Sequence, residues 1–280
     1  MMIALVLGST GLIGNTIFRV LSDQASLDVY GTVRSNHTSF KLKNILTNID
    51  VLDNSKLNEI FAKLQPDVVI NCVGLTKHLD DHSSPINSIL LNSLFPHRLA
   101  HICNLYESRL IHISTDCVFS GKKGFYSESF QPDAEDNYGR SKILGEVLYG
   151  DSVTIRTSTI GHELNTNYGL LNWFLSQKNK CKGYKNAVFS GLPTVVLAYT
   201  IRDYILNNRK LKGLYHLAAS PINKFDLLSL IAKIYKKKID IEVDEQFVID
   251  RSLNGEKFNQ ATGFKAPDWP ELIKIMYQNK

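Results

Sequence analysis

No run of apolar residues in this 280-residue sequence approaches the ~18 that a membrane-spanning helix needs. Cysteine is also scarce, and no two cysteines have C-x-x-C spacing; the four are Cys72, Cys103, Cys117 and Cys181. This pattern favours reduced, buried thiols in a cytoplasmic protein. The first eight residues lack the basic segment of a signal peptide and end at a glycine. We therefore expect a strand entering a turn there.

Charge of one sign is in small excess, with 32 Lys and Arg against 27 Asp and Glu, a net charge of +5. The lysines are scattered, and the densest run, residues 236–238, is expected to be a solvated helix end. Neither a nucleic-acid partner nor a membrane surface is predicted. Apolar residues make up 44% and charged residues 21%, which excludes a disordered chain and a collagen-like fibre.

Strand-like apolar runs alternate with helical patterns from the start of the chain. Strands are expected at residues 3–7, 28–33, 67–73 and 109–114, and helices at 12–22, 57–64 and 86–107. The alternation predicts an α/β fold with a doubly wound parallel sheet covered by helices on both faces. Beyond Arg156 the pattern loosens, with strands expected at 154–156 and 213–217 and helical or loop segments at 169–177 and 222–235. We expect a sheet domain from residues 1–160 and 195–219, and a smaller discontinuous α/β substrate-binding cap from residues 161–194 and 220–280.

Three glycines lie between the first expected strand and the first expected helix. Glycine there permits a tight turn, a close backbone approach to a pyrophosphate and close packing of helix on strand, while the helix amino terminus offers free N–H groups. The strand, loop and helix together predict a Rossmann dinucleotide site. Its loop residues are Gly8, Ser9, Thr10, Gly11, Leu12, Ile13 and Gly14.

The second expected strand ends in Val33-Arg34-Ser35, without the acid that usually binds the adenosine 2′-hydroxyl of NAD; Asp28 lies at the strand's start. A guanidinium suits a 2′-phosphate, so the sheet domain is predicted to bind NADP(H) through Arg34, with NAD(H) as the alternative. A surface arginine without a ligand is the other interpretation. Further cofactor contacts are expected at Asp50, Val51, Asn71, Cys72, Val73, Gly74 and Asn92.

Tyr138 and Lys142 are four residues apart in a segment, 136–148, that is expected to be helical, so they share one face. They follow the strand that ends at Ser114-Thr115-Asp116, where a cleft at the carboxyl ends of the strands would need them. A phenol with a pKa near 10 becomes a better proton donor beside an ammonium and a nicotinamide cation. Tyr138 is then expected to protonate a carbonyl oxygen while a hydride reaches its carbon, with Thr115 bound to the same oxygen and Lys142 also on the cofactor ribose. An amphipathic helix with an exposed tyrosine and lysine is the alternative.

In these motifs the chain resembles the extended short-chain dehydrogenase/reductase superfamily and, more narrowly, the dTDP-4-dehydrorhamnose reductase family. The matching segments are residues 8–14, 66–71, 112–119, 138–142, 156–158, 189–194, 213–217 and 253–269. The resemblance implies a catalytic set of Thr115, Tyr138 and Lys142. It also implies that NADPH or NADH reduces the 4-keto group of a 6-deoxy-hexose on a nucleoside diphosphate, for bacterial cell-surface polysaccharide.

The chain departs from the rhamnose enzymes at residues 159–162, where they have an aromatic pair, and residues 180–188 look more like the branch that acts on UDP-linked N-acetylated 6-deoxy-sugars. The nucleotide base and the sugar therefore stay open, as does a homodimer. Substrate contacts are expected at Lys77, His78, Thr115, Asp116, Val118, Phe119, Gly191, Pro193, Thr194 and Arg251.

Two histidine pairs, His78 with His82 and His97 with His101, have helical metal-ligand spacing. A zinc site needs a third ligand, and no metal is predicted. Epimerisation beside the ketone, with or without reduction, is an alternative activity that needs a further base such as His162 or His78. A non-catalytic regulatory subunit is an alternative of another class, against which the threonine, tyrosine and lysine set argues.

Overall fold

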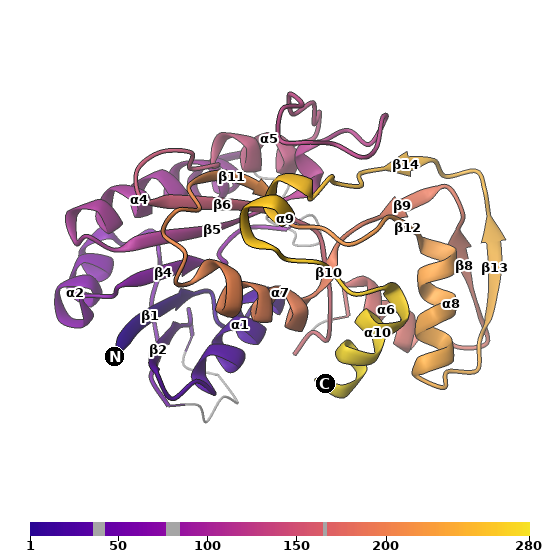
Figure 1. Cartoon of the computed structure of the whole chain (residues 1–280), viewed down its shortest axis with the longest axis horizontal. Helices are drawn as coiled ribbons and strands as arrows, with labels where there is room; N and C mark the ends of the chain where they lie inside the picture. The colour runs from indigo at the N-terminus through magenta and orange to yellow at the C-terminus, as the bar shows by residue number, and fades with distance from the viewer. Residues whose placement is uncertain (36–42, 77–84, 165–166) are drawn as a thin grey trace. The chain divides into compact units, whose positions relative to one another are not determined.

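The central sheet has seven strands in the order β11-β6-β5-β4-β1-β2-β3 in the computed structural model, which describes residues 1–35, 43–76, 85–164 and 167–280 (Figure 1). The strands are β1 (Met2–Leu7), β2 (Leu27–Thr32), β3 (Ile45–Leu46), β4 (Val68–Asn71), β5 (Arg109–Thr115), β6 (Ser152–Thr157) and β11 (Gly213–His216). β1 pairs in parallel with β2 and β4, β2 with β3, and β4 with β5. The predicted Rossmann-like α/β fold is confirmed. The strand order reverses between β1 and β4, which is where such folds bind ligands.

Helices connect these strands as the sequence pattern indicates. They are α1 (Leu12–Ser22), α2 (Asn54–Leu64), α3 (Pro85–Ser88), the π-helical η2 (Ile89–Leu94), α4 (Phe95–Leu105) and α5 (Asn137–Leu144). In Figure 1, α1 and α4 lie on opposite faces of the strands. Leu5 and Leu7 of β1 share one buried cluster with Phe61 of α2 and Leu99 of α4. Removing such side chains from water is the main driving force for this layer.

Two predicted helices differ in detail from the observed ones. The helix expected at 86–107 is present but contains the π-helical turn η2. The helix expected at 136–148 ends at Leu144, because the chain turns at Gly145, where a Cβ atom would collide with the backbone oxygen of Asn92. Tyr138 and Lys142 both remain within α5.

The chain divides into two compact units. The first comprises Met1–Ser114, Glu135–Ile155 and Ala198–Leu214, and the second comprises Thr115–Ala134, Arg156–Leu197 and Tyr215–Lys280. The assignment of the cofactor to residues 1–160 and 195–219, and of the substrate to 161–194 and 220–280, stays a prediction. None of the helices in the described ranges has the length and apolar character to cross a bilayer.

The second unit is built from short elements. Its strands include β7 (Thr159–Ile160), β8 (Lys180–Tyr184), β9 (Ala187–Phe189), β10 (Leu192–Pro193), β12 (Ile222–Asn223), β13 (Asp240–Asp244) and β14 (Ile249–Asp250), and its helices include η3 (Asp116–Val118), α6 (Leu170–Ser176), α8 (Lys224–Ile234), α9 (Glu256–Thr262) and α10 (Trp269–Gln278). β8 pairs with β13, β10 with β7, and β9 lies between β12 and β14. The remaining helices, α7 (Thr194–Thr200) and η4 (Ile201–Ile205), lead back to the first unit.

The lysine run at 236–238 is more than a solvated helix end. α8 ends before it, as expected, but Lys237 Nζ donates hydrogen bonds to the backbone oxygens of Leu175, at 2.9 Å, and Gln177, at 2.7 Å. These oxygens lie at the end of α6, where carbonyl groups lack helical partners. Lys237 therefore stabilises the end of another helix.

Candidate active site

The loop after β1 has the backbone of an anion-binding site. Gly8 has a φ of +82°, a conformation that L residues with side chains rarely adopt. Its N–H donates to Thr32 Oγ1 at 3.3 Å, and the N–H of Gly11 donates back to the Gly8 oxygen at 3.0 Å. Gly11 is the N-cap of α1 and supplies no side-chain cap, so the first N–H groups of the helix stay available to a ligand.

Gly14 lets the first helix approach this loop. A Cβ atom at position 14 would collide with the Gly8 oxygen and lie 3.2 Å from Cys72 Cβ. A Cβ atom at Gly11 would meet only the Gly8 oxygen, at 3.4 Å, an ordinary contact. The close packing expected of the glycine pattern therefore depends on Gly14 more than on Gly11.

The segment after β4 lies against the same loop. A Cβ atom on Gly8 would be 3.1 Å from Val73 Cγ2 and 3.4 Å from the backbone of Cys72, so the chain after β4 borders the loop after β1. Asn71 Oδ1 accepts from the Val73 N–H at 3.0 Å. Burial raises the pKa of the Cys72 thiol to about 12, which makes a nucleophilic role for that thiol unfavourable.

The residues predicted around the adenosine differ in accessibility. Arg34 is an exposed residue two positions after the end of β2. Asp50 is exposed and accepts a hydrogen bond from the Leu52 N–H at 2.9 Å, whereas Val51 is buried. The two residues between Gly8 and Gly11 also differ in accessibility: Ser9 is buried and Thr10 is exposed.

Lys142 is a buried ammonium on α5, only 5% exposed. Its Nζ donates to the backbone oxygen of Ile113 in β5 at 2.9 Å and is 4.0 Å from where a Cβ atom of Gly74 would stand. Burial lowers the pKa of Lys142 to about 8, against the opposing charges of Glu146 and Cys72. Tyr138 precedes Lys142 by one helical turn, so both side chains project from one face of α5.

In the second unit, Thr115 and Asp116 are buried and bonded to each other. Thr115 Oγ1 donates to Asp116 Oδ1 at 3.1 Å and accepts from the Cys117 N–H at 3.1 Å. Burial raises the pKa of Asp116, although the Arg251 guanidinium and hydrogen bonds from Thr115, Cys117 and Ser158 oppose the shift. Ser158 was not predicted from the sequence. The family-like segment 156–158 contains it, but no spacing signal singles out the serine within that segment.

Several predicted substrate residues are buried in the second unit. Val118 and Phe119 are wholly buried, and Phe119 stacks on Tyr126 with ring centroids 4.1 Å apart, so neither side chain is exposed to a ligand in this structure. The loop residues Gly191, Pro193 and Thr194 are also buried. A Cβ atom on Gly191 would collide with the Ser158 oxygen.

Two basic side chains of the second unit surround Asp116. Arg251 Nε donates to the Phe119 oxygen at 2.8 Å, and its Nη1 lies 3.6 Å from Cys117 Sγ. Lys224 interacts through its charge with Asp116, Cys117 and Arg251, and burial lowers its pKa. Lys224 was missed from the sequence, although a lysine opening a helix has the wrong sign for the helix dipole and could have marked it.

The histidines are placed in other surroundings. His97 shares hydrogen bonds with Tyr149 Oη at 2.8 Å and the Leu144 oxygen at 2.7 Å, and His162 Nε2 with Tyr235 Oη at 2.9 Å. No cluster of three or more metal-ligating side chains occurs within the described ranges. The predicted substrate residues Lys77 and His78, and with them His82, lie outside the described residues.

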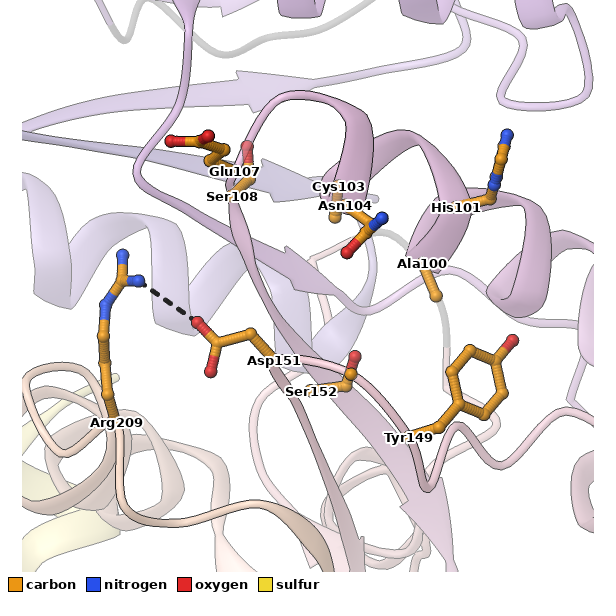
Figure 2. Close-up of a pocket in the computed structure, with 11 residues that line it drawn as sticks. Ala100, His101, Cys103, Asn104, Glu107, Ser108, Tyr149, Asp151, Ser152 and Arg209 are labelled. Carbon is orange, nitrogen blue, oxygen red and sulfur yellow. Dashed lines mark hydrogen bonds and ion pairs between the residues drawn. The ribbon is translucent and has the colours of Figure 1, made fainter.

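A cavity of about 480 Å³ lies in the first unit but away from the glycine loop (Figure 2). It is lined by α4 and the loop before β6, and Asp151 there pairs with Arg209 at 3.2 Å. Two of its lining residues lie at the amino ends of strands: Ser108 directly precedes β5, and Ser152 is the first residue of β6. Ligands of such sheets bind at the carboxyl ends, so this cavity is not the cofactor site.

Comparisons with known proteins agree with this geometry. The family model described as the RmlD substrate binding domain matches residues 1–280. The chain is 36% identical over 146 residues to the probable low-salt glycan biosynthesis reductase Agl14 of Haloferax volcanii, covering 52% of this chain and 48% of that protein. It is 24% identical to the dTDP-4-dehydrorhamnose reductase of Escherichia coli, covering 97% and 96% of the two chains.

A solved structure shares the whole fold. The dTDP-4-dehydrorhamnose reductase of Bacillus anthracis in complex with NADP superposes with a TM-score of 0.84 at 18% identity, covering 100% of both chains. Three curated relatives, Agl14 among them, are matched over only 40% to 48% of their own length. The family resemblance inferred from the motifs is confirmed.

Proposed function

We propose that this chain, which belongs to the RmlD substrate binding domain family, is an NADPH-dependent reductase of a nucleoside-diphosphate 4-keto-6-deoxy-hexose in bacterial cell-surface polysaccharide biosynthesis. One observation carries the proposal. A buried Lys142 stands one helical turn from Tyr138, in the same unit as a glycine loop with free helix N–H groups. Similarity to a dTDP-4-dehydrorhamnose reductase and to a probable glycan biosynthesis reductase supports the substrate class.

The first unit fits a dinucleotide. Gly14 leaves no room for a side chain between α1 and the loop before it, and α1 opens without a side-chain cap. The exposed Arg34 after β2 suits the 2′-phosphate of NADP(H), because a guanidinium binds phosphate oxygens in a fork. NAD(H) is the alternative cofactor, and turnover with NADPH and NADH at equal concentrations would separate the two.

Residues of α5 and β5 have separate roles in the reduction. The bound nicotinamide supplies a hydride to the ketone carbon. Tyr138 gives its phenolic proton to the ketone oxygen, so that C=O becomes CH–OH. The ammonium of Lys142 favours this proton transfer. Within the described part of the chain one of its hydrogens is used, by the Ile113 oxygen, which leaves two donors for the cofactor ribose.

Thr115 has a single hydroxyl proton, which the structure directs to Asp116 Oδ1. For Thr115 to donate to the ketone oxygen, this bond has to open when the substrate binds. Asp116 can then accept from Ser158 and from Cys117 alone. We infer that Asp116 positions the Thr115 hydroxyl before the reaction, and that this hydroxyl turns to donate a hydrogen bond to the substrate oxygen during it.

The test supplies 4-keto-6-deoxy sugars on both UDP and dTDP, made in place by a dehydratase, and follows the loss of NADPH absorbance. Turnover with one of them supports the reductase and identifies the nucleotide. No turnover with either, alongside tight NADPH binding, contradicts the proposed substrate. Giving the 4-keto sugar, freed of the dehydratase, to the chain in deuterated water and comparing C3 and C5 with a sample that lacks the chain tests the epimerase alternative, because an epimerase exchanges those hydrogens faster than the uncatalysed background.

The cellular compartment and the oligomeric state are also proposals. Cys72, Cys103, Cys117 and Cys181 are all free thiols, which suits a reducing cytoplasm. A homodimer is proposed as the assembly, and sedimentation equilibrium of the purified chain tests it.

A further inference from the structure

His112 is a polar residue inside the central sheet. It is wholly buried in β5, and the residue paired with it across the strands is Asn71 of β4, which is also wholly buried. Strands of a parallel sheet that are covered on both faces are normally apolar throughout, as residues 68–70 of β4 are. A pair of polar side chains at this depth departs from that pattern. Proteins accept such departures mainly at functional or strained sites.

The hydrogen bonds of Asn71 determine which nitrogen of His112 carries the proton. Asn71 Oδ1 accepts from the Val73 N–H at 3.0 Å, so the amide nitrogen of the same side chain, Nδ2, faces His112 Nδ1 at 3.1 Å. An amide nitrogen donates and does not accept, so Nδ1 has to be the bare nitrogen and the ring proton lies on Nε2. Burial and the charges of Lys142 and His97 lower the pKa of His112 well below its usual value, which keeps the ring neutral.

This arrangement leaves one polar group of the ring without a partner. Among the described residues, none forms a hydrogen bond with His112 Nε2, which is buried. An unpaired buried N–H is unfavourable. With the proton on Nδ1, however, two N–H groups would face each other, either at Asn71 or, after a flip of its carboxamide, at Val73. The folded chain therefore bears an unpaired Nε2–H and keeps a bare Nδ1 for Asn71.

Asn71 connects this ring to the glycine loop after β1. Through the Val73 N–H it fixes the chain that follows β4. That chain touches both of the glycines whose surroundings are tight. A Cβ atom on Gly8 would be 3.1 Å from Val73 Cγ2, and one on Gly14 would be 3.2 Å from Cys72 Cβ. Residues 72 and 73 thus form one wall of the loop, and a shift of this wall would press on the loop or open a gap beside it.

We propose that His112 is a positioning residue of the cofactor site: its bare Nδ1 fixes the carboxamide of Asn71, which holds Val73 and with it the wall of the glycine loop. The inference rests on the proposed function, in which NADPH binds at that loop. Because His112 is wholly buried, it acts on the cofactor through Asn71 and not by contact. The role requires a hydrogen-bond acceptor at the position of Nδ1, whereas the rest of the ring only fills space.

Titration of the whole chain with NADPH, followed by quenching of protein fluorescence, tests this role. His112→Leu removes the acceptor and should weaken NADPH binding at least ~10-fold, because a buried donor of Asn71 is left unpaired. His112→Asn should stay within ~3-fold of the wild type, since its Oδ1 is as many bonds from the backbone as Nδ1 and accepts the same hydrogen bond. Thr154→Val is the matched control. It removes a buried hydrogen bond of neighbouring β6, from Thr154 Oγ1 to the Val147 oxygen at 2.7 Å, and should bind NADPH as the wild type does.

Nitrogen NMR of protein labelled at histidine tests the state of the ring. The signals of His112 are identified by their loss in His112→Asn. Near pH 7 the wild type should show a bare Nδ1 and a protonated Nε2. Asn71→Asp keeps an oxygen for the Val73 N–H but offers the ring no amide donor, so a proton should appear on Nδ1 of His112. A loss of stability alone would not move this proton.

The outcomes distinguish a positioning role from a purely structural one. Equal weakening of NADPH binding in His112→Leu and Thr154→Val would mean that His112 only supports the sheet, and the inference fails. Wild-type affinity in His112→Leu also overturns it, as does a wild-type spectrum with the proton on Nδ1, while the reductase proposal stands if turnover persists. A wild-type chain that binds neither NADPH nor NADH overturns the proposed function and this inference together. Should His112→Leu not fold, His112→Met replaces it, and the spectra of the wild type and Asn71→Asp still decide.

Discussion

Asn92 Nδ2 donates a hydrogen bond to Ser141 Oγ over 3.0 Å, and this bond ties the π-helical turn η2 to the helix that carries Tyr138 and Lys142. The same carboxamide donates to the Leu75 oxygen at 3.2 Å and accepts from the Leu75 N–H at 2.9 Å. Asn92 was predicted to contact the cofactor. Both of its donors are already used inside the first unit, where they hold α5 and the chain after β4, and its contact with the cofactor stays a prediction.

Replacing Asn92 with alanine should therefore destabilise the chain by about 2–4 kcal/mol, because it removes the partner of the Leu75 N–H and oxygen and one of the hydrogen bonds of the Ser141 hydroxyl. Urea unfolding monitored by circular dichroism measures this change. Asn104→Ala, at an exposed site of neighbouring α4, is the matched control and should stay within ~0.5 kcal/mol of the wild type. Equal free energies of unfolding for the two variants would contradict a stabilising role for the hydrogen bonds of Asn92.

Tyr138→Phe should lower turnover at least ~10²-fold, because the phenolic proton has no substitute. NADPH binding should survive, since the glycine loop is untouched, and quenching of protein fluorescence by NADPH measures it. Tyr106→Phe is the control, as the Tyr106 hydroxyl makes only a long 3.5 Å contact with the Asn58 oxygen. Turnover of Tyr138→Phe near the wild-type rate would refute the proposed proton donor.

The pH dependence of turnover should reflect Lys142. Its pKa of about 8, lowered by burial from 10.5, means that the ammonium is present below pH 8 and lost above it. We expect kcat to fall as pH rises through about 8. Between pH 8 and 10.5 the unfolded chain binds this proton more tightly than the folded one, so the stability contribution of the group rises with pH over that window.

A profile of kcat against pH, taken between 6 and 10, checks this expectation. Lys142→Arg keeps its charge over the whole range, so its remaining activity should lack the alkaline fall. If that variant declines at the same pH as the wild type, another group controls the reaction.

The two glycines of the loop should differ in their tolerance of alanine. Gly14→Ala places a Cβ atom against the Gly8 oxygen, so α1 has to move, and NADPH affinity should fall at least ~10-fold. Gly11→Ala meets only an ordinary contact at 3.4 Å and should bind NADPH within ~3-fold of the wild type. Titration of both variants with NADPH measures the difference. An equal loss of NADPH affinity in the two variants would mean that close packing at Gly14 does not explain the glycine pattern.

Much of the first unit could be predicted because its signals are local. The apolar periodicity of 12–22 predicted α1 with its observed bounds, and the glycine spacing marked the loop before it. The four-residue spacing of Tyr138 and Lys142 required only that α5 be helical. The halt of α5 at Gly145 was missed, because it depends on the Asn92 backbone, which is distant in sequence.

By itself, the sequence determined the Rossmann-like order of strands and helices, the glycine loop and the tyrosine–lysine pair, because each depends on neighbours within a few residues. Only the tertiary structure decided that Lys142 is buried, that Asn92 holds α5, and that Arg251 donates to the Phe119 oxygen. Burial and charge interactions between residues more than a hundred positions apart are set by how the chain packs, and no short-range pattern records them.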